Sequence, residues 1–221
     1  MLHISSDQLR FAIGDTYAFS EEAVGWARRS GTAFSLELPQ EGIPLSTGLL
    51  EFASHALTPW QRTVQRALHW LERALLADEN LERLLFGFFA IEAVLGDAAD
   101  GLKGDVLAVR RMVLDHAVTD GFADPGRLWF LYDAVRSTAV HGEAVPIVTE
   151  GEVERFLGDI AQALDQAVQF SGAITKKAAL HRKLDGDDSV PDLIAWMRAN
   201  CGSDWEPHLA SFETRHRHLT T

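Results

Sequence analysis

Apolar residues recur at three- and four-residue steps over much of the chain, the spacing that puts them on one face of an α-helix. The most regular stretch follows Thr149, which forms a capping-box pattern with Glu152, and it ends at Gly172. Its apolar positions are Val153, Phe156, Leu157, Ile160, Leu164, Ala167 and Val168. Similar stretches upstream predict a helical bundle of about five helices over residues 58–172.

The first two helices of this bundle have clear boundaries in the sequence. Thr58 as N-cap, Pro59 at the first helical position and Gln61 three residues after the cap together mark a helix start. The second helix follows Asp78 or Asn80 and ends at Gly96. Because this second helix is apolar nearly all round, we expect it at the centre of the bundle.

The third and fourth helices carry the arginines that matter for function. Residues 102–117 form the third, with Arg110 at the edge of its apolar stripe. The fourth begins at Asp124-Pro125, an acidic N-cap followed by proline, and ends at Gly142. Arg136 lies in its second half.

The two flanks have weaker patterns. Residues 1–57 are interpreted as a small α/β appendage, because residues 8–13 and 32–38 alternate apolar and polar positions as strands do. Residues 173–221 are interpreted as a C-terminal accessory tail with a short helix ending near Asn200. The predicted fold class is therefore mainly α.

Charge and cysteine content limit the kinds of function that the chain can have. The 221-residue chain is 47% apolar with a net charge of −12, which argues against general nucleic-acid affinity but allows a small site for one scissile phosphate. Cys201 is the only cysteine, which fits a reducing cytoplasm and excludes an intrachain disulfide. No signal peptide and no membrane-spanning stretch is expected, since the longest apolar run is interrupted by Gly87 and Glu92.

Arg136 and His141 are the candidate catalytic residues. An arginine fork can bind a phosphate and a histidine can transfer protons near neutral pH, so the two groups are capable of phosphate chemistry. In an α-helix, positions five apart face roughly 140° away from each other. The two residues therefore meet only if the helix frays or if a second subunit supplies the other half. Alternatively, Arg136 pairs with Asp133 and His141 is a favourable cation at a helix C-terminus.

Glu92, Arg110 and Tyr132 are the candidate supporting residues. A carboxylate inside an apolar helix needs a partner, and we expect Arg110 first and Arg136 second. Such a Glu–Arg pair could serve only to fix helix register, or it could also orient Arg136. Tyr132, one turn before Arg136, could reach the site with its hydroxyl or could simply be a core aromatic residue.

No metal or organic cofactor is predicted. His216 and His218 lack the accompanying cysteine or carboxylate spacing of a metal site and are better explained as part of a solvated tail. The chain also contains no glycine pattern for nucleotide phosphates.

The sequence RSTAVHG at residues 136–142, preceded by LFGFFAIEAVLG and VLAVRRMVL, resembles the HEPN superfamily and most of all its Apea-like branch. The resemblance covers roughly residues 58–172 and includes a Glu at the place of Glu92. It implies a dimerising HEPN-like helical bundle. Many such domains are metal-independent ribonucleases whose Arg and His form a composite site at the dimer interface, and others are inactive.

Two functions follow from the resemblance. The first is an endoribonuclease acting on RNA in a defence or stress response, as a toxin with a possible neutralising partner. The second is a non-catalytic HEPN-like dimerisation or interaction module, acting as a partner or sensor subunit. The intact Arg136/His141 pair favours the enzyme, and the acidic net charge favours the module.

Overall fold

The structure is a computed structural model in which the chain divides into two compact units, Met1–Leu45 and Ser46–Thr221. The residues it describes are 10–13, 15–18, 45–54, 58–97, 104–121, 125–137, 139, 141 and 148–221.

In the first unit the described residues form one antiparallel hairpin. Strand β1 (Arg10–Ile13) pairs with β2 (Asp15–Ala18) in a register that places Phe11 opposite Tyr17. Strand β1 falls within the stretch predicted to be extended. The second predicted strand, residues 32–38, lies outside the described residues.

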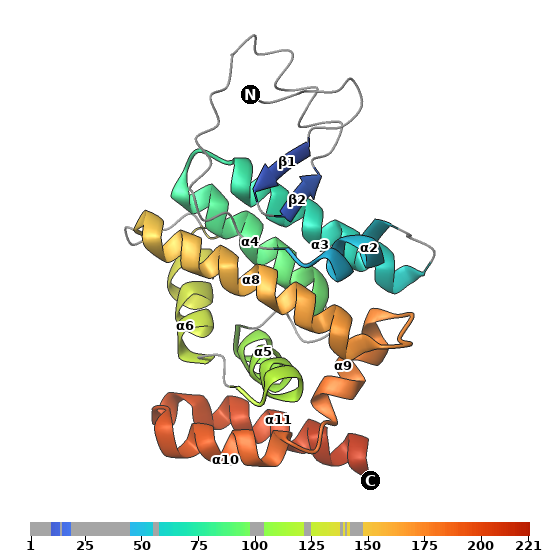
Figure 1. Cartoon of the computed structure of the whole chain (residues 1–221). Helices are drawn as coiled ribbons and strands as arrows, with labels where there is room; N and C mark the ends of the chain where they lie inside the picture. The colour runs from blue at the N-terminus through green and yellow to red at the C-terminus, as the bar shows by residue number, and fades with distance from the viewer. Residues whose placement is uncertain are drawn as a thin grey trace. The chain divides into compact units, whose positions relative to one another are not determined.

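The described residues from Ser46 onward form nine α-helices and no β-strand, so this unit is all-helical (Figure 1). The α-helices are α2 (Thr47–Ser54), α3 (Pro59–Leu76), α4 (Asn80–Leu95), α5 (Gly104–Thr119), α6 (Pro125–Phe130), α8 (Glu150–Ser171), α9 (Lys177–Asp185), α10 (Val190–Asn200) and α11 (Glu206–Thr220). A π-helix, η2 (Leu131–Ser137), continues α6, and a 3₁₀ turn, η3 (Ser203–Trp205), precedes α11. Within the described part of the chain, no helix is both long enough and apolar enough to span a membrane.

Local capping signals explain why α3 and α8 begin where they do. Thr58 accepts a hydrogen bond from the Gln61 backbone, and the Gln61 side chain accepts one from the Thr58 backbone. Thr149 and Glu152 form the same reciprocal arrangement at the start of α8. Gly172 ends α8 with φ +53°, a conformation in which a side chain would be strained.

Helix α4 lies at the centre of the helical unit. It packs against α3, α5, η2 and α8. Figure 1 shows α8 running beside α4, with α5 on the far side of α8 in this view. Gly87 makes the close approach of α4 and α8 possible, because a Cβ there would lie 2.6 Å from the Phe156 ring. Phe88, next to it, is fully buried, with its ring centroid 4.6 Å from that of Phe156.

Two parts of the helical unit extend beyond the expected bundle. Helix α2 lies within the stretch assigned from the sequence to the α/β appendage of residues 1–57, and it packs on α3 and α8. Its start is stabilised by Ser46, whose hydroxyl accepts from the Leu49 backbone and donates to Asp165. The expected C-terminal tail consists of α9, α10 and α11, all of which contact α5. His216 is accordingly half-buried and contacts the Asp185 carbonyl, so the expectation of a solvated tail is wrong there.

The helix that carries Arg136 is not a regular α-helix. It is α-helical over Pro125–Phe130 and π-helical over Leu131–Ser137, whereas a continuous α-helix was expected. A π-helix bonds residues five apart and often marks a functional site. The widened turn keeps Leu131, Tyr132 and Val135 buried while the intervening Asp133 stays exposed.

Candidate functional site

Arg136 is held by Glu92, which projects from α4. Arg136 Nε lies 3.0 Å from Glu92 Oε1, and Arg136 Nη2 donates to Oε2 at 3.4 Å. The Nε–H is not aligned with Oε1, so the closer contact is an ion pair without a well-directed hydrogen bond. Glu92 is 9% exposed and the Arg136 side chain is 17% exposed. In the structure, the partner of Glu92 is therefore Arg136, which sequence reasoning had placed second after Arg110.

Tyr132 completes this group from the same π-helix as Arg136. Its hydroxyl donates a hydrogen bond to the Glu92 carboxylate, and the Arg136 guanidinium lies 5.1 Å from the centre of its ring. The ring packs edge-on against Phe88 and directly over Gly104, where a Cβ would lie 2.7 Å away. Tyr132 is thus both a core aromatic residue and a hydroxyl donor to the site.

Burial shifts the protonation of both acidic groups in this cluster. Loss of solvent raises the pKa of Glu92, and the attraction and hydrogen bond of Arg136 and the hydrogen bond of Tyr132 only partly offset it. Burial, together with the nearby Glu92 charge, raises the pKa of Tyr132 to about 12. The Tyr132 hydroxyl therefore stays protonated at neutral pH and remains available as a donor.

His141 lies beyond the π-helix and is exposed. Its backbone N–H bonds the Ser137 carbonyl at 3.1 Å, an α-type spacing of four residues. Among the described residues, no hydrogen bond or ion pair joins its side chain to Glu92, Tyr132 or Arg136. One chain therefore brings together Glu92, Tyr132 and Arg136 and leaves His141 outside this group.

Arg110, the first-choice partner of Glu92, is used elsewhere. Its Nε and Nη2 bond the two carboxylate oxygens of Asp185 at 2.7 Å each, and its Nη1 bonds the Leu95 carbonyl at 2.7 Å. Arg110 is 2% exposed, so this bidentate pair lies inside the protein. The expectation that Arg110 binds Glu92 is wrong, because Asp185 on α9 offers both oxygens to the guanidinium.

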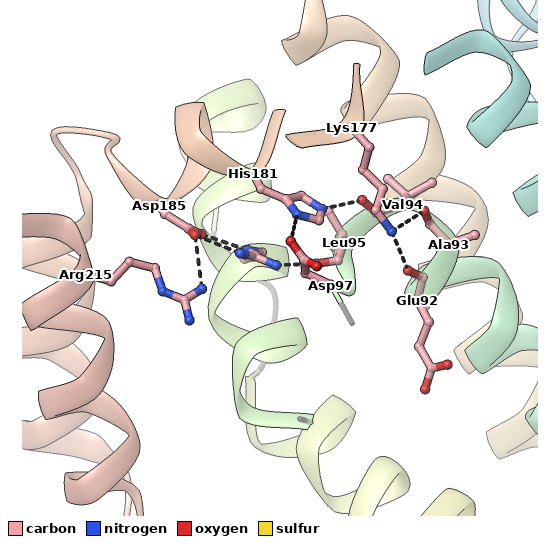
Figure 2. Close-up of polar contacts among 10 residues, drawn as sticks. Glu92, Ala93, Val94, Leu95, Asp97, Lys177, His181, Asp185 and Arg215 are labelled. Carbon is pink, nitrogen blue, oxygen red and sulfur yellow. Dashed lines mark hydrogen bonds and ion pairs between the residues drawn. The ribbon is translucent and has the colours of Figure 1, made fainter. Parts of the chain in front are cut away.

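Three cationic or polar side chains bind the last carbonyls of α4, directly behind Glu92 (Figure 2). Lys177 Nζ donates to the Ala93 carbonyl at 3.0 Å, and His181 Nε2 lies 2.9 Å from the Val94 carbonyl. A carbonyl only accepts, so Nε2 carries the ring proton. Arg110 supplies the third contact. These bonds satisfy the carbonyls that a helix end leaves unpaired. The positive charges also interact favourably with the negative end of the helix dipole.

The Glu92 side chain points away from this capping cluster (Figure 2). Its own carbonyl accepts from the Gly96 backbone at 3.0 Å and from Lys177 at 3.4 Å, while its carboxylate faces Arg136. Burial lowers the pKa of Lys177. The backbone on which Glu92 stands is therefore fixed independently of its ion pair.

An open groove of about 480 Å³ borders Glu92 on the side of α3 and α9. Its lining combines basic, aromatic and acidic side chains. The lining residues are Thr63, Arg66, Trp70, Phe89, Glu92, Ala93 and Lys177. Glu92, the residue whose carboxylate pairs with Arg136, is therefore one of the residues that line this groove.

The described residues contain no group of three or more His, Cys, Asp or Glu side chains that could hold a metal ion. His216 Nδ1 instead lies 3.1 Å from the Asp185 carbonyl, a contact between α11 and α9.

Comparison with known proteins found no protein-family model, no curated protein and no solved structure that matches this chain.

Sequence reasoning missed the residues of α9 that support the site. Lys177, His181 and Asp185 lie four residues apart, so they share one face of a helix. That spacing was visible in the sequence, but the stretch was interpreted only as part of the C-terminal accessory tail.

Proposed function

We propose that this chain is a HEPN-like, metal-independent endoribonuclease in which Arg136 and His141 carry the chemistry. The observation that supports it most is the orientation of Arg136. Glu92 occupies the Nε and Nη2 side of the guanidinium, which leaves the Nη1 edge to meet a phosphate. Tyr132 fixes the carboxylate in turn. The held arginine and the solvent-exposed histidine five residues later are the two kinds of group that metal-free phosphate chemistry requires.

The proposed reaction is a transesterification. The 2′-oxygen of the RNA attacks the neighbouring phosphorus while a histidine accepts the 2′-hydroxyl proton. The bond from phosphorus to the 5′-oxygen then breaks, and an acid donates a proton to that oxygen. The products are a 2′,3′-cyclic phosphate and a 5′-hydroxyl. Arg136 stabilises the extra negative charge on the phosphorane.

A homodimer supplies the second proton-transfer group. One chain carries one His141, whereas the reaction needs both a base and an acid, and two copies would provide two histidines and two arginines. Phe130 supports an interface on this helix, because it is 55% exposed at the end of α6, directly before the π-helix that carries Arg136. In such a dimer, burial of the exposed Phe130 ring would stabilise the interface through the hydrophobic effect.

The second candidate is a non-catalytic HEPN-like dimerisation or interaction module. The ion pair between Arg136 and Glu92 favours it, because a mainly buried arginine that is already paired is also what a purely structural role would produce. In that case Phe130 and Arg136 would serve the interface alone. The proposed role in defence or stress response, with RNA as substrate and a neutralising partner, rests on the resemblance.

RNA incubated with the purified protein in the presence of a chelator tests the enzyme. We expect cleavage of the RNA and no cleavage of DNA of the same sequence, because only RNA has the attacking 2′-hydroxyl. Cleavage that stops in the chelator, or that cuts both polymers, would contradict the proposed chemistry.

A further inference from the structure

Helix α3 presents a basic face in a strongly acidic chain. Arg62, Arg66, His69, Trp70 and Arg73 recur at three- and four-residue steps, so they lie on one side of the helix. The three arginines are exposed, and His69 and Trp70 are partly exposed. We call these five residues the α3 face.

The charge on the α3 face opposes that of the whole protein. Helix α3 carries three arginines and one carboxylate, Glu72, hence a net charge of 3 − 1 = +2, whereas the chain carries −12. Glu72, the one carboxylate of this helix, lies 3.6 Å from the His69 ring. The acidic residues Asp78, Glu79 and Glu82 follow only after the helix ends. Helix α3 is therefore locally positive, although the chain as a whole is acidic.

Aromatic rings lie among these cations. Trp70 stacks on Phe86 with ring centroids 5.8 Å apart and meets Phe89 edge-on at 5.1 Å. All three rings are only half-buried. The Arg73 guanidinium lies 5.5 Å from the Trp70 ring. Half-exposed rings with guanidinium groups beside them are the arrangement on which single-stranded bases stack.

The α3 face continues into the groove that borders Glu92. Arg66 and Trp70 belong to both, and the opposite wall of the groove is formed by Glu92 and Lys177. Lys176, the residue before Lys177 in the sequence, is exposed. A polyanion bound along the α3 face would therefore lie beside Arg66 and Lys177, next to the α4 residue that pairs with Arg136.

We propose that the α3 face and its groove bind single-stranded RNA, with bases stacked on Trp70 and Phe89 and phosphates paired with the arginines. Whether the bound strand is then cut at Arg136 rests on the proposed function, whereas binding does not. Arg62 to Arg73 spans about 16 Å of helix at 1.5 Å per residue, room for on the order of four nucleotides. A duplex keeps its bases stacked on each other and cannot offer them to Trp70.

The proposal is tested by anisotropy with a labelled single-stranded DNA of about twelve nucleotides, which binds through the same contacts but cannot be cut. Trp70→Ala is expected to weaken binding by about 5- to 150-fold, the effect of losing one stacked base. Arg66→Gln is expected to lower the slope of log affinity against log salt by about one phosphate contact. Matched controls elsewhere on the helical unit are Trp196→Ala, with a 39% exposed ring on α10, and Arg155→Gln on α8.

Each result separates binding from catalysis. Weaker binding by Trp70→Ala and Arg66→Gln with unchanged controls supports the proposal, even if no RNA is ever cut. Wild-type affinity in both variants, equal losses in the controls, or equal binding of polyglutamate would overturn it. RNA cleavage at the wild-type rate by a Trp70→Ala protein of wild-type helicity, measured at RNA concentrations far below saturation, would also overturn it and would leave the proposed chemistry intact.

Discussion

Arg136 Nε lies 3.0 Å from Glu92 Oε1, and these two residues join α4 to the π-helix η2. The carboxylate is buried more deeply than the guanidinium it holds. Burying the charged Glu92 carboxylate therefore costs free energy of desolvation. Because this cost applies only to the ionised carboxylate, the contribution of the pair to stability depends on pH.

Glu92→Gln is expected to change the pH dependence of stability. Because burial raises the pKa of Glu92, the folded protein holds the proton more tightly than the unfolded chain does. The stabilisation from this proton is complete below the ordinary value of 4.5 and is lost as the pH rises through the folded-state pKa. Glutamine stays neutral, so the variant should gain stability relative to wild type between about pH 4 and about pH 7. Urea denaturation at both pH values measures the difference in unfolding free energy between the variant and wild type. The same difference at both pH values would contradict the prediction.

Tyr132 offers a direct optical test of the site. The chain has two tyrosines, Tyr17 and Tyr132, so phenolate absorbance can be assigned by one substitution. Wild type should show a step near the pKa of about 12 that burial and Glu92 impose on Tyr132. Tyr132→Phe should remove that step and leave the other. Two steps near the ordinary value of 10.0 would show that Tyr132 is not held as described.

Arg110→Met is expected to destabilise the protein strongly. It leaves the Asp185 carboxylate and the Leu95 carbonyl without their main buried donor. Breaking a buried pair from one side costs about 3–5 kcal/mol. We expect the lower end, because Arg215 still lies 3.2 Å from Asp185. Thermal and urea unfolding measure the loss.

Arg198→Met is the matched control for Arg110→Met. Arg198 bonds Glu206 and Glu213 at the surface, where solvent replaces a lost partner, so stability should change little. Equal losses in the two variants would contradict the difference in burial.

Phe130→Asp is expected to separate the proposed dimer. A charge at this exposed position would oppose burial in an interface but would disturb no core contact. Light scattering at a concentration on the order of tens of micromolar should show a dimer for wild type and a monomer for the variant. Trp196→Asp, also at an exposed ring, should stay dimeric. A monomeric wild type would count against the composite site.

Local signals in the sequence predicted much of the fold. The caps at Thr58 and Thr149 place the starts of α3 and α8 correctly, because a cap depends on neighbours within three residues. The π-helix was missed because the periodicity was interpreted with α-helical spacing. Sequence reasoning also ranked Arg110 above Arg136 as the partner of Glu92, which was wrong. The choice between the two arginines depends on Asp185, which is far away in sequence and reaches Arg110 only through the packing of α9 on α5.

The sequence also contained the α3 face without revealing its use. Trp70 and Arg66 were visible, but only the apolar stripe of that helix was interpreted. The groove forms when α4 and α9 bring Glu92 and Lys177 alongside, a tertiary relationship that spacing cannot supply.

The measurement that tests the central claim most directly is single-turnover cleavage of RNA in chelator by wild type, Arg136→Ala and His141→Ala. Wild type should leave 2′,3′-cyclic phosphate ends. His141→Ala should be slower by roughly 10²–10⁴ and Arg136→Ala by roughly 10²–10³. His141→Ala should unfold like wild type, because His141 is exposed. The same turnover by wild type and His141→Ala, including none, across several RNAs and with candidate partners present, would contradict the enzyme and favour the interaction module.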